Sequence, residues 1–330
     1  MASMKKLLVS VSTAIAMCGI AATPAAAAEE TYGMVVFLKG SEFFNWAYAG
    51  FQDAAKTVGA KTELQGPADW DASAEARAVD QLVAAGAKGV AVTAGDANTL
   101  VSSIDKGIAK GVPILTFDSD SPKSKRLLFV GTNHFNAGYQ AGLKMGELLG
   151  EKGRIGISMI PGLDSINGRI AGFEAGLKKA APGAKVVATV NDEGDLQKAE
   201  TVNTAMLQAN PEINGIFCGH GNPATGAAAA ARNVGRDQGD NKVSVMGFAI
   251  DVPILQMVER GELVGTVAQN PYLMGVMSFH MLYAAAHKTQ FDNMNRPGFG
   301  NVPTADLDTG VAILLKGDPA LKTLATPPKL

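Results

Sequence analysis

Residues 111–118 read Gly-Val-Pro-Ile-Leu-Thr-Phe-Asp, an apolar run that follows a glycine and a proline and ends at a carboxylate. A short apolar run with such boundaries is typical of a strand buried on both faces of a parallel sheet. A helical pattern at 100–110 precedes it, and another short apolar run lies at 89–93. This order of strand, helix and strand predicts a βαβ unit with parallel strands.

The same alternation of short apolar runs and longer helical patterns continues along the chain. It predicts an α/β fold with parallel sheets flanked by helices on both faces. The pattern forms two blocks without a low-complexity linker, so we expect several short crossings between two lobes. The expected strands span 34–38, 89–93, 113–117, 154–159, 185–190, 215–218 and 243–248, and the expected helices span 44–58, 74–85, 100–110, 137–149, 169–180, 197–209, 224–234 and 253–260.

The amino-terminal segment is typical of an export signal. Two lysines precede an apolar stretch, and a run of small residues ends just before Glu29. We therefore expect 1–28 to be a cleaved signal peptide and the mature protein to be exported. Because Cys18 falls within this segment, the mature chain keeps only Cys218 and no internal disulfide is expected.

Composition and charge exclude several classes of protein. Hydrophobic residues make up 47% of the chain and the formal net charge is −2, which argues against disorder and against nucleic-acid binding. No later segment is long and apolar enough for a membrane span. The four histidines lack the spacing of metal ligands, and no Walker-type loop or nucleophile elbow occurs. We expect neither a metal nor a cofactor.

Polar and aromatic residues follow the expected strands in both blocks. Ligands of open parallel sheets bind at the carboxyl ends of the strands. A cleft between two lobes is therefore the expected pocket. The segments at the strand ends are 39–44, 118–121, 161–169, 219–222, 249–251 and 269–270.

Several motifs resemble those of type I periplasmic binding proteins, in particular the ribose-binding branch. The resemblance spans nearly the whole mature chain and depends on the order and spacing of the motifs. The motifs are Phe43 with Phe44, the run at 111–118, the segment 169–173 and the segment 267–275.

This resemblance implies two Rossmann-like lobes that hinge about three crossings. It places the crossings near 131–132, 268–270 and 307–308. The implied lobes are an N-terminal one, 29–131 plus 270–307, and a C-terminal one, 132–269 plus 308–330.

The resemblance assigns four ligand-binding residues to the first block. Phe43 and Phe44 match an aromatic pair that stacks on a sugar, whose C–H face a flat ring can cover. Asp118 matches an acidic residue that accepts hydrogen bonds from two sugar hydroxyls, and charge-assisted bonds of this kind are strong. Ser119 replaces the arginine of the ribose-binding type, which points away from ribose itself.

Ligand-binding residues of the second block depart further from the family pattern. Asn167 stands where an arginine is usual, and Arg169 follows two residues later. Asp251 is the candidate for the aspartate that the family places at the position of Ala249. These changes favour a neutral polyhydroxy compound other than ribose.

Two loops complete the expected second half of the site. His220 replaces a family asparagine, with Asn222 close enough to substitute, and a neutral imidazole can both donate and accept hydrogen bonds. Gln269 lies at an expected crossing, where one side chain can contact both ligand and hinge.

The resemblance implies a solute-binding protein of an ABC importer. It would bind a monosaccharide or sugar alcohol by hydrogen bonds and aromatic stacking, close its lobes, and deliver the solute to the membrane permease. We expect a monomer with no enzymatic activity.

Three alternatives stay open at this stage. The same fold could serve chemotaxis or a sensor kinase. The segment 219–224 formally fits Gly-x-Gly-x-x-Ala, with Asp240 downstream, which would indicate an NAD-dependent oxidoreductase. Pro223 counts against it, because a phosphate site needs free N–H groups. A sugar-responsive repressor would need a DNA-binding segment where this chain has its leader.

Overall fold

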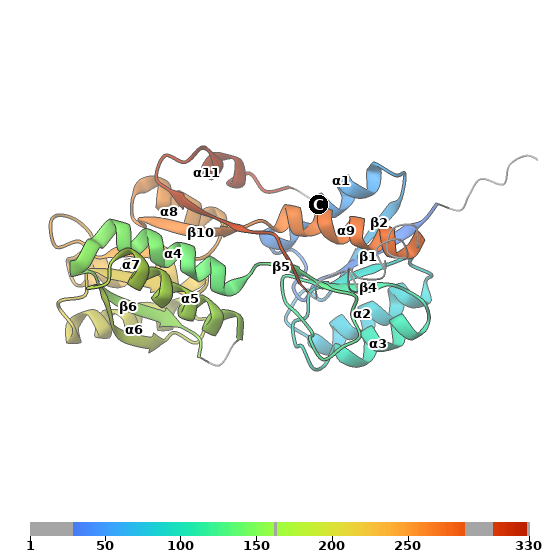
Figure 1. Cartoon of the computed structure of the whole chain (residues 1–330), viewed down its shortest axis with the longest axis horizontal. Helices are drawn as coiled ribbons and strands as arrows, with labels where there is room; N and C mark the ends of the chain where they lie inside the picture. Colours follow the sequence, from blue (N-terminus) through green and yellow to red (C-terminus); the bar gives the residue numbers. More distant parts are fainter. Residues whose placement is uncertain (1–28, 162–163, 288–305, 329–330) are drawn as a thin grey trace, which may run out of the picture.

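The computed structural model describes residues 29–161, 164–287 and 306–328. The molecule is elongated, with two lobes placed end to end (Figure 1). Each lobe contains one six-stranded sheet covered by helices on both faces. The predicted α/β architecture of two helix-flanked parallel sheets is therefore confirmed. The expected signal peptide lies outside the described residues.

The first sheet is entirely parallel, in the order β11-β5-β4-β3-β1-β2. Helices α1 and α9 pack on one face, and α2 and α3 on the other. The strands are β1 (Thr31–Val35), β2 (Lys61–Gln65), β3 (Val90–Val92), β4 (Ile114–Phe117), β5 (Phe129–Gly131) and β11 (Asp306–Asp308). The helices are α1 (Glu42–Lys56), α2 (Ala72–Ala84), α3 (Val101–Ala109) and α9 (Pro271–His287).

The second sheet has the order β12-β10-β9-β8-β6-β7, and only β12 runs antiparallel to its neighbour. Helices α4 and α5 pack on one face, and α6, α7, α8 and α11 on the other. The strands are β6 (Arg154–Met159), β7 (Lys185–Asn191), β8 (Gly215–Cys218), β9 (Ser244–Gly247), β10 (Gly265–Gln269) and β12 (Val311–Leu315). The helices are α4 (His134–Leu149), a 3₁₀ turn (Gly150–Lys152), α5 (Asp164–Ala180), α6 (Leu196–Ala209), α7 (Asn222–Asn233), α8 (Val252–Arg260) and α11 (Pro319–Leu324).

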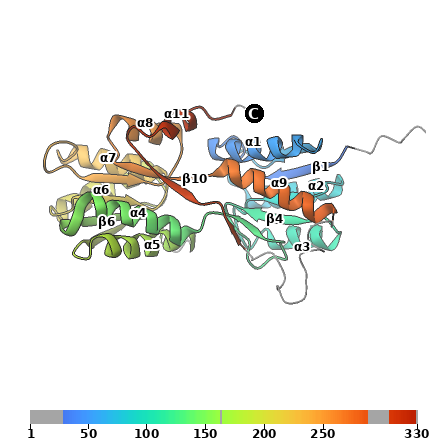
Figure 2. The same cartoon turned by 45° about the horizontal axis from the view of Figure 1, so that its top comes forward.

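The chain crosses between the sheets after β5, after β10 and after β11, where the lobes meet (Figure 2). Hydrogen bonds tie these crossings to one another. Gln269 Nε2 donates to Thr132 Oγ1 at 2.8 Å, and the Asn133 N–H donates to Asp308 Oδ1 at 3.0 Å. The three crossings therefore form one connected junction.

The first strand differs from its expected position. We expected 34–38, but β1 spans Thr31–Val35. Phe37 and Leu38 leave the sheet and line the space between the lobes. These two apolar side chains are half-buried outside the sheet, so the apolar pattern in the sequence extends past the end of the strand.

Glycines let paired helices approach closely at two places that matter for the cleft. A Cβ at Gly138 of α4 would overlap the carbonyl oxygen of Arg169 on α5. A Cβ at Gly275 of α9 would overlap the carbonyl oxygen of Ala47 on α1. Any larger residue there would push apart the helices that carry the polar and aromatic residues of the cleft.

A buried carboxyl group lies in the core of the first lobe. Glu75 of α2 has no exposed surface, and its Oε2 accepts a hydrogen bond from the Gly95 N–H at 3.0 Å. Burial raises the pKa of Glu75 from 4.5 to about 8, against the opposing effect of this bond. The folded lobe therefore holds this group protonated at neutral pH.

Glu75→Gln should remove a pH-dependent loss of stability. Because the pKa is higher in the folded state than in the unfolded one, the wild-type protein should lose stability as pH rises from 4.5 to about 8. One pKa unit corresponds to about 1.4 kcal/mol of stability. The melting temperature of the variant minus that of the wild type should therefore be several degrees larger at pH 8 than at pH 5. Thermal unfolding across this range measures the difference. Glu259→Gln, an exposed change on α8, is the control, and equal pH profiles for both variants would contradict the assignment.

Candidate functional site

A cavity of about 270 Å³ lies between the lobes, where the carboxyl ends of both sheets face each other. Its lining comes from both lobes and both sides of the junction, so it is the expected interlobe pocket. The lining residues are Phe37, Leu38, Ser41, Phe43, Phe44, Asp118, Ser119, His134, Ser165, Arg169, Asp251 and Gln269.

The first lobe contributes an aromatic wall. Phe44 is 4% exposed and packs edge-on against Phe37, at 4.9 Å between ring centroids, and against Phe43, at 5.4 Å. Phe117 of β4 supports it from the core at 6.3 Å. Such edge-to-face pairs are favourable, so the rings support one another.

Asp118 follows β4 directly and lines the cavity from the first lobe. Its backbone is in the left-handed region, with φ 59°, although its N–H stays in register by donating to the Val130 carbonyl at 3.0 Å. Left-handed backbone is unfavourable for a residue with a Cβ, and such positions concentrate at functional sites. Burial raises the pKa of Asp118 to about 6, while Arg169 acts in the opposite direction.

Arg169 of α5 lines the cavity from the second lobe and is 9% exposed. Its Nη1 donates to the Gly219 carbonyl at 3.0 Å, and its guanidinium lies over the Phe248 ring, 3.7 Å from the centroid. Burial lowers its pKa to about 10, with Asp118 opposing the shift. Its Nε is buried and has no hydrogen-bond partner among the described residues.

His134 also lines the cavity, and we did not expect it from the sequence. It is the first residue of α4, directly after the first crossing. Burial, and then Arg169, lower its pKa to about 4, so the ring is neutral. The sequence pattern predicts this helix only from residue 137. The signal that points to His134 is its position beside an expected crossing.

The structure brings most of the expected site residues together. Phe43, Phe44, Asp118, Ser119, Arg169, Asp251 and Gln269 all line this cavity. A neighbouring cavity of about 170 Å³ shares four of these seven, namely Phe43, Arg169, Asp251 and Gln269.

Two expected site residues line neither cavity, and the side chain of a third is not described. Asn167 is exposed on α5 and lines neither of these two cavities. His220 also lines neither, although Gly219 and Gly221 beside it contact Arg169 and the smaller cavity. Asn222 is the first residue of α7, and its side chain lies outside the described part of the structure.

One hydrogen bond links the lobes across the cleft, away from the crossings. The N-cap residue of α8, Asp251, makes no side-chain cap. Instead, Glu42 of α1 accepts a hydrogen bond from the Val252 N–H at 3.2 Å, so the first lobe caps a helix of the second. Desolvation, and then the nearby Glu42 carboxylate, raise the pKa of Asp251.

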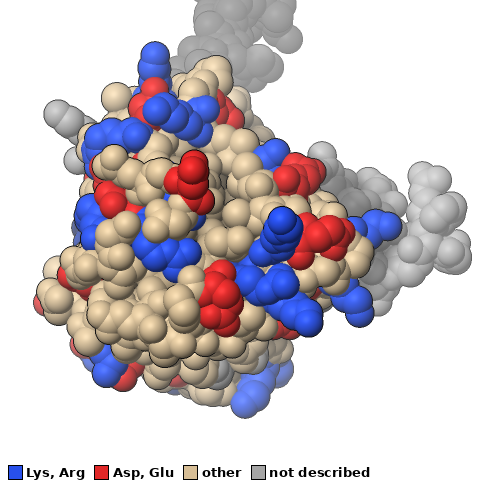
Figure 3. Space-filling view, turned by 90° about the vertical axis from the view of Figure 1, so that its left-hand side faces the viewer, with Lys and Arg blue, Asp and Glu red and all other residues tan. Residues whose placement is uncertain are grey.

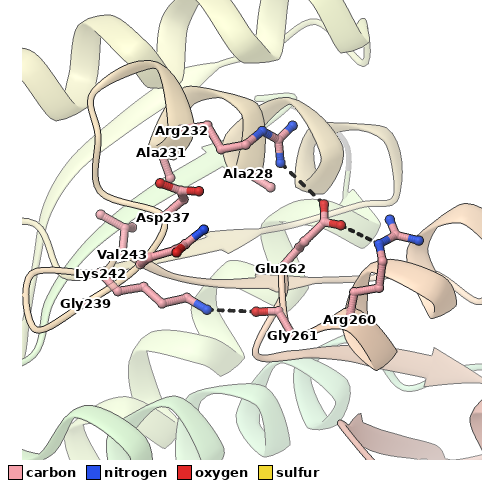
Figure 4. Close-up of a pocket in the computed structure, with 11 residues that line it drawn as sticks. Ala228, Ala231, Arg232, Asp237, Gly239, Lys242, Val243, Arg260, Gly261 and Glu262 are labelled. Carbon is pink, nitrogen blue, oxygen red and sulfur yellow. Dashed lines mark hydrogen bonds and ion pairs between the residues drawn. The ribbon is translucent and has the colours of Figure 1, made fainter.

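A larger cavity, of about 680 Å³, lies at the far end of the second lobe (Figure 3). Its charged groups are largely paired among themselves (Figure 4). Glu262 binds both Arg232 and Arg260, and Lys242 Nζ donates to the Gly261 carbonyl at 2.7 Å. We therefore place the candidate site in the cleft rather than here.

The described residues show neither a cluster of metal ligands nor a membrane span. They contain no group of three or more His, Cys, Asp or Glu side chains that could hold a metal ion. None of their helices has both the length and the apolar character needed to cross a bilayer.

A family model described as periplasmic binding protein domain matches residues 32–290. The D-allose-binding periplasmic protein of Escherichia coli is 28% identical over 280 residues, which cover 82% of this chain and 88% of that protein. The ribose import binding protein of Bacillus subtilis is 26% identical over 251 residues, covering 76% and 79%.

Solved structures show the same architecture. An arabinose binding protein from Geobacillus stearothermophilus superposes with a TM-score of 0.83 at 27% identity, over 90% of this chain and 99% of that one. A solute binding protein from Burkholderia graminis in complex with D-arabinose has a TM-score of 0.71 at 27% identity, over 87% and 95%.

Removing the interlobe cap should widen the resting cleft. We expect Glu42→Ala to lengthen the distance between spin labels at Lys88→Cys and Lys178→Cys in solute-free protein, because α8 loses its cap from the other lobe. Asp251→Asn should shorten the distance between the labels, because the repulsion from Glu42 disappears. In protein that already carries Glu42→Ala, Asp251→Asn should not change this distance. Double electron–electron resonance measures these distances.

The buried Cys218 should not compete for the label. Glu174→Ala, an exposed change on α5, is the matched control. Identical distances for Glu42→Ala and this control would show that the cap does not hold the lobes.

Proposed function

Because the chain belongs to the periplasmic binding protein domain family, we propose that it is the solute-binding protein of an ABC importer and binds a monosaccharide or sugar alcohol in the interlobe cleft. The observation that carries this proposal is the pairing of Asp118 and Arg169 on opposite walls of one cavity, beside the wall formed by Phe37, Phe43 and Phe44. The two charges belong to different lobes, so a solute between them contacts both.

The chemistry of the lining fits a neutral polyhydroxy compound. The carboxylate of Asp118 accepts hydrogen bonds from hydroxyls, and the guanidinium of Arg169 can donate to a hydroxyl or ring oxygen. The aromatic wall covers the C–H face of a sugar ring. Similarity to the allose-binding and ribose-binding relatives supports a sugar, and Ser119, in place of the arginine of the ribose-binding type, favours one other than ribose.

We further propose that the lobes close over the solute about the three crossings. The proposed N-terminal lobe is 29–131 plus 270–307, and the proposed C-terminal lobe is 132–269 plus 308–330. Gln269, which bonds Thr132 and also lines the cavity, would connect solute and hinge. Asn167, His220 and Asn222 would reach the solute only after closure, because all the bonds form together only in the closed state.

The same proposal places the protein in the periplasm. The basic and apolar leader would direct export, and the closed protein would act as a monomer that docks on a membrane permease. It would release the solute there without chemical conversion.

A sugar or polyol should raise the melting temperature, and loss of either charge should remove the rise. Solute at 100 times its dissociation constant adds about 2.7 kcal/mol to the stability of the wild-type protein. Asp118→Ala and Arg169→Ala should each weaken binding at least tenfold, because each leaves its partner charge unsatisfied. A thermal-shift screen of pentoses, hexoses and polyols, followed by calorimetry, measures this.

Asp237→Ala in the distant cavity is the matched control for Asp118→Ala. It should bind as wild type does. A screen in which no polyhydroxy compound shifts the melting temperature would contradict the proposed function.

Affinity should also fall at low pH. The pKa of Asp118 is raised to about 6, so its carboxylate becomes protonated below that pH and accepts fewer hydrogen bonds from the solute. Above pH 6 the affinity should change little, and below it the dissociation constant should rise by up to about tenfold per pH unit. Calorimetry between pH 4.5 and 8 measures the trend. Asp118→Asn should bind weakly at every pH, and an unchanged decline in that variant would assign it to another group.

A further inference from the structure

A buried carboxylate lies behind the cleft face of the second lobe. Asp192, directly after β7, has no exposed surface. Its Oδ2 accepts from Ser158 Oγ at 2.8 Å, and its Oδ1 accepts from the Gly194 N–H at 2.9 Å and contacts His220 Nε2 at 2.8 Å. Burial opposes its ionisation, but the hydrogen bonds, led by that of His220, hold the pKa of Asp192 below its usual range.

Neighbouring elements fix the orientation of this carboxylate. Ser158 belongs to β6, and its hydroxyl also accepts a hydrogen bond from Asn203 Nδ2 of α6 at 3.0 Å. The same amide donates to the Ala199 carbonyl at 2.7 Å. The carboxylate is therefore held by β6, by α6 through Ser158, and by the turn at Gly194, which leaves it little freedom to rotate.

His220 meets this carboxylate from the loop after β8. A carboxylate can only accept, so Nε2 of His220 must carry the proton of their hydrogen bond. In the neutral ring Nδ1 is then a bare acceptor. The His220 side chain keeps 16% of its surface exposed, and because Nε2 faces the buried Asp192, that surface belongs to other parts of the ring.

The loop that carries His220 lies next to the cleft. The loop follows the carboxyl end of β8, and its neighbour Gly219 accepts the hydrogen bond from Arg169. Gly221, on the other side, lines the smaller interlobe cavity. A ring held between these two residues is well placed to contact a solute once the lobes close.

We propose that Asp192 is a positioning residue that holds the His220 ring with Nδ1 free to accept a hydrogen bond from one hydroxyl of the solute. This inference rests on the proposed function and makes it more specific. The solute must present an O–H donor at that position. An ether oxygen, a fluorine or a carboxylate there cannot donate, so compounds that carry one are discriminated against.

The ring can be tested without any solute. The chain has four histidines, and Asp192→Asn, Asp192→Leu and Ser158→Ala test the network around His220. Nitrogen-15 spectra of histidine-labelled protein at about pH 8, with His220→Gln to assign the signal, report which ring nitrogen carries the proton. We expect Nε2–H with bare Nδ1 in the wild type.

The variants separate positioning from support of the fold. Asp192→Asn keeps an acceptor oxygen and should keep this tautomer. Asp192→Leu has no acceptor and should give a mixture of tautomers. Ser158→Ala removes only the partner of Oδ2 and should leave the His220 spectrum unchanged.

Binding then tests the link to the solute. With the best solute from the screen, His220→Ala and Asp192→Leu should each weaken binding roughly three- to tenfold, and Asp192→Leu should add nothing in the His220→Ala background. In a series of monodeoxyfluoro analogues of that solute, fluorine in place of the hydroxyl at one position should lower the affinity for the wild type. The same analogue should lose no affinity for His220→Ala.

Several results would overturn the proposal. One is a wild-type His220 with its proton on Nδ1 or on both nitrogens. Another is an Asp192→Leu effect on affinity that persists without His220, since Asp192 would then act by another route. If Asp192→Leu does not fold, the wild-type spectrum and Asp192→Asn still decide the tautomer. If no polyhydroxy compound binds, the proposed function fails, while the solute-free spectra still decide whether Asp192 sets the ring.

Discussion

The burial of Arg169 is the constraint on which the geometry of the cleft depends. Removing a guanidinium from water costs several kcal/mol unless polar groups replace its hydration. One carbonyl and the Phe248 ring supply part of that replacement. The backbone of Arg169 on α5 lies directly against Gly138 of α4, where a Cβ would overlap its carbonyl oxygen. A molecule bound in the cavity can supply the rest of the polar contacts that replace the hydration of the guanidinium.

Asp118 is the complement of this cation on the first lobe. Its left-handed backbone and raised pKa show that the fold holds it there at some cost. A hydroxylated molecule between the two groups can donate to one and accept from the other. Neither lobe alone can satisfy both charges, so recognition and approach of the lobes are physically coupled.

Much of the fold could be predicted from the sequence, because buried parallel strands leave a clear pattern. The expected ranges 154–159 and 215–218 coincide with β6 and β8. β2 was not predicted, since its edge position leaves it a polar sequence, Lys-Thr-Glu-Leu-Gln. In the site, strand ends identified Phe43, Asp118 and Gln269. Links between residues far apart in sequence, such as Glu42 with Val252 and Ser158 with Asp192, leave no local signal and required the structure.

The cap that Glu42 places on α8 bears on how tightly a solute can bind. When a protein spends only a fraction of its time in the binding-competent shape, the observed affinity is the intrinsic affinity multiplied by that fraction. A contact between the lobes that exists without solute enlarges the fraction, whereas the negative charges of Glu42 and Asp251 act against it. Changes at these two acidic side chains can thus shift the range of solute concentrations over which the protein binds.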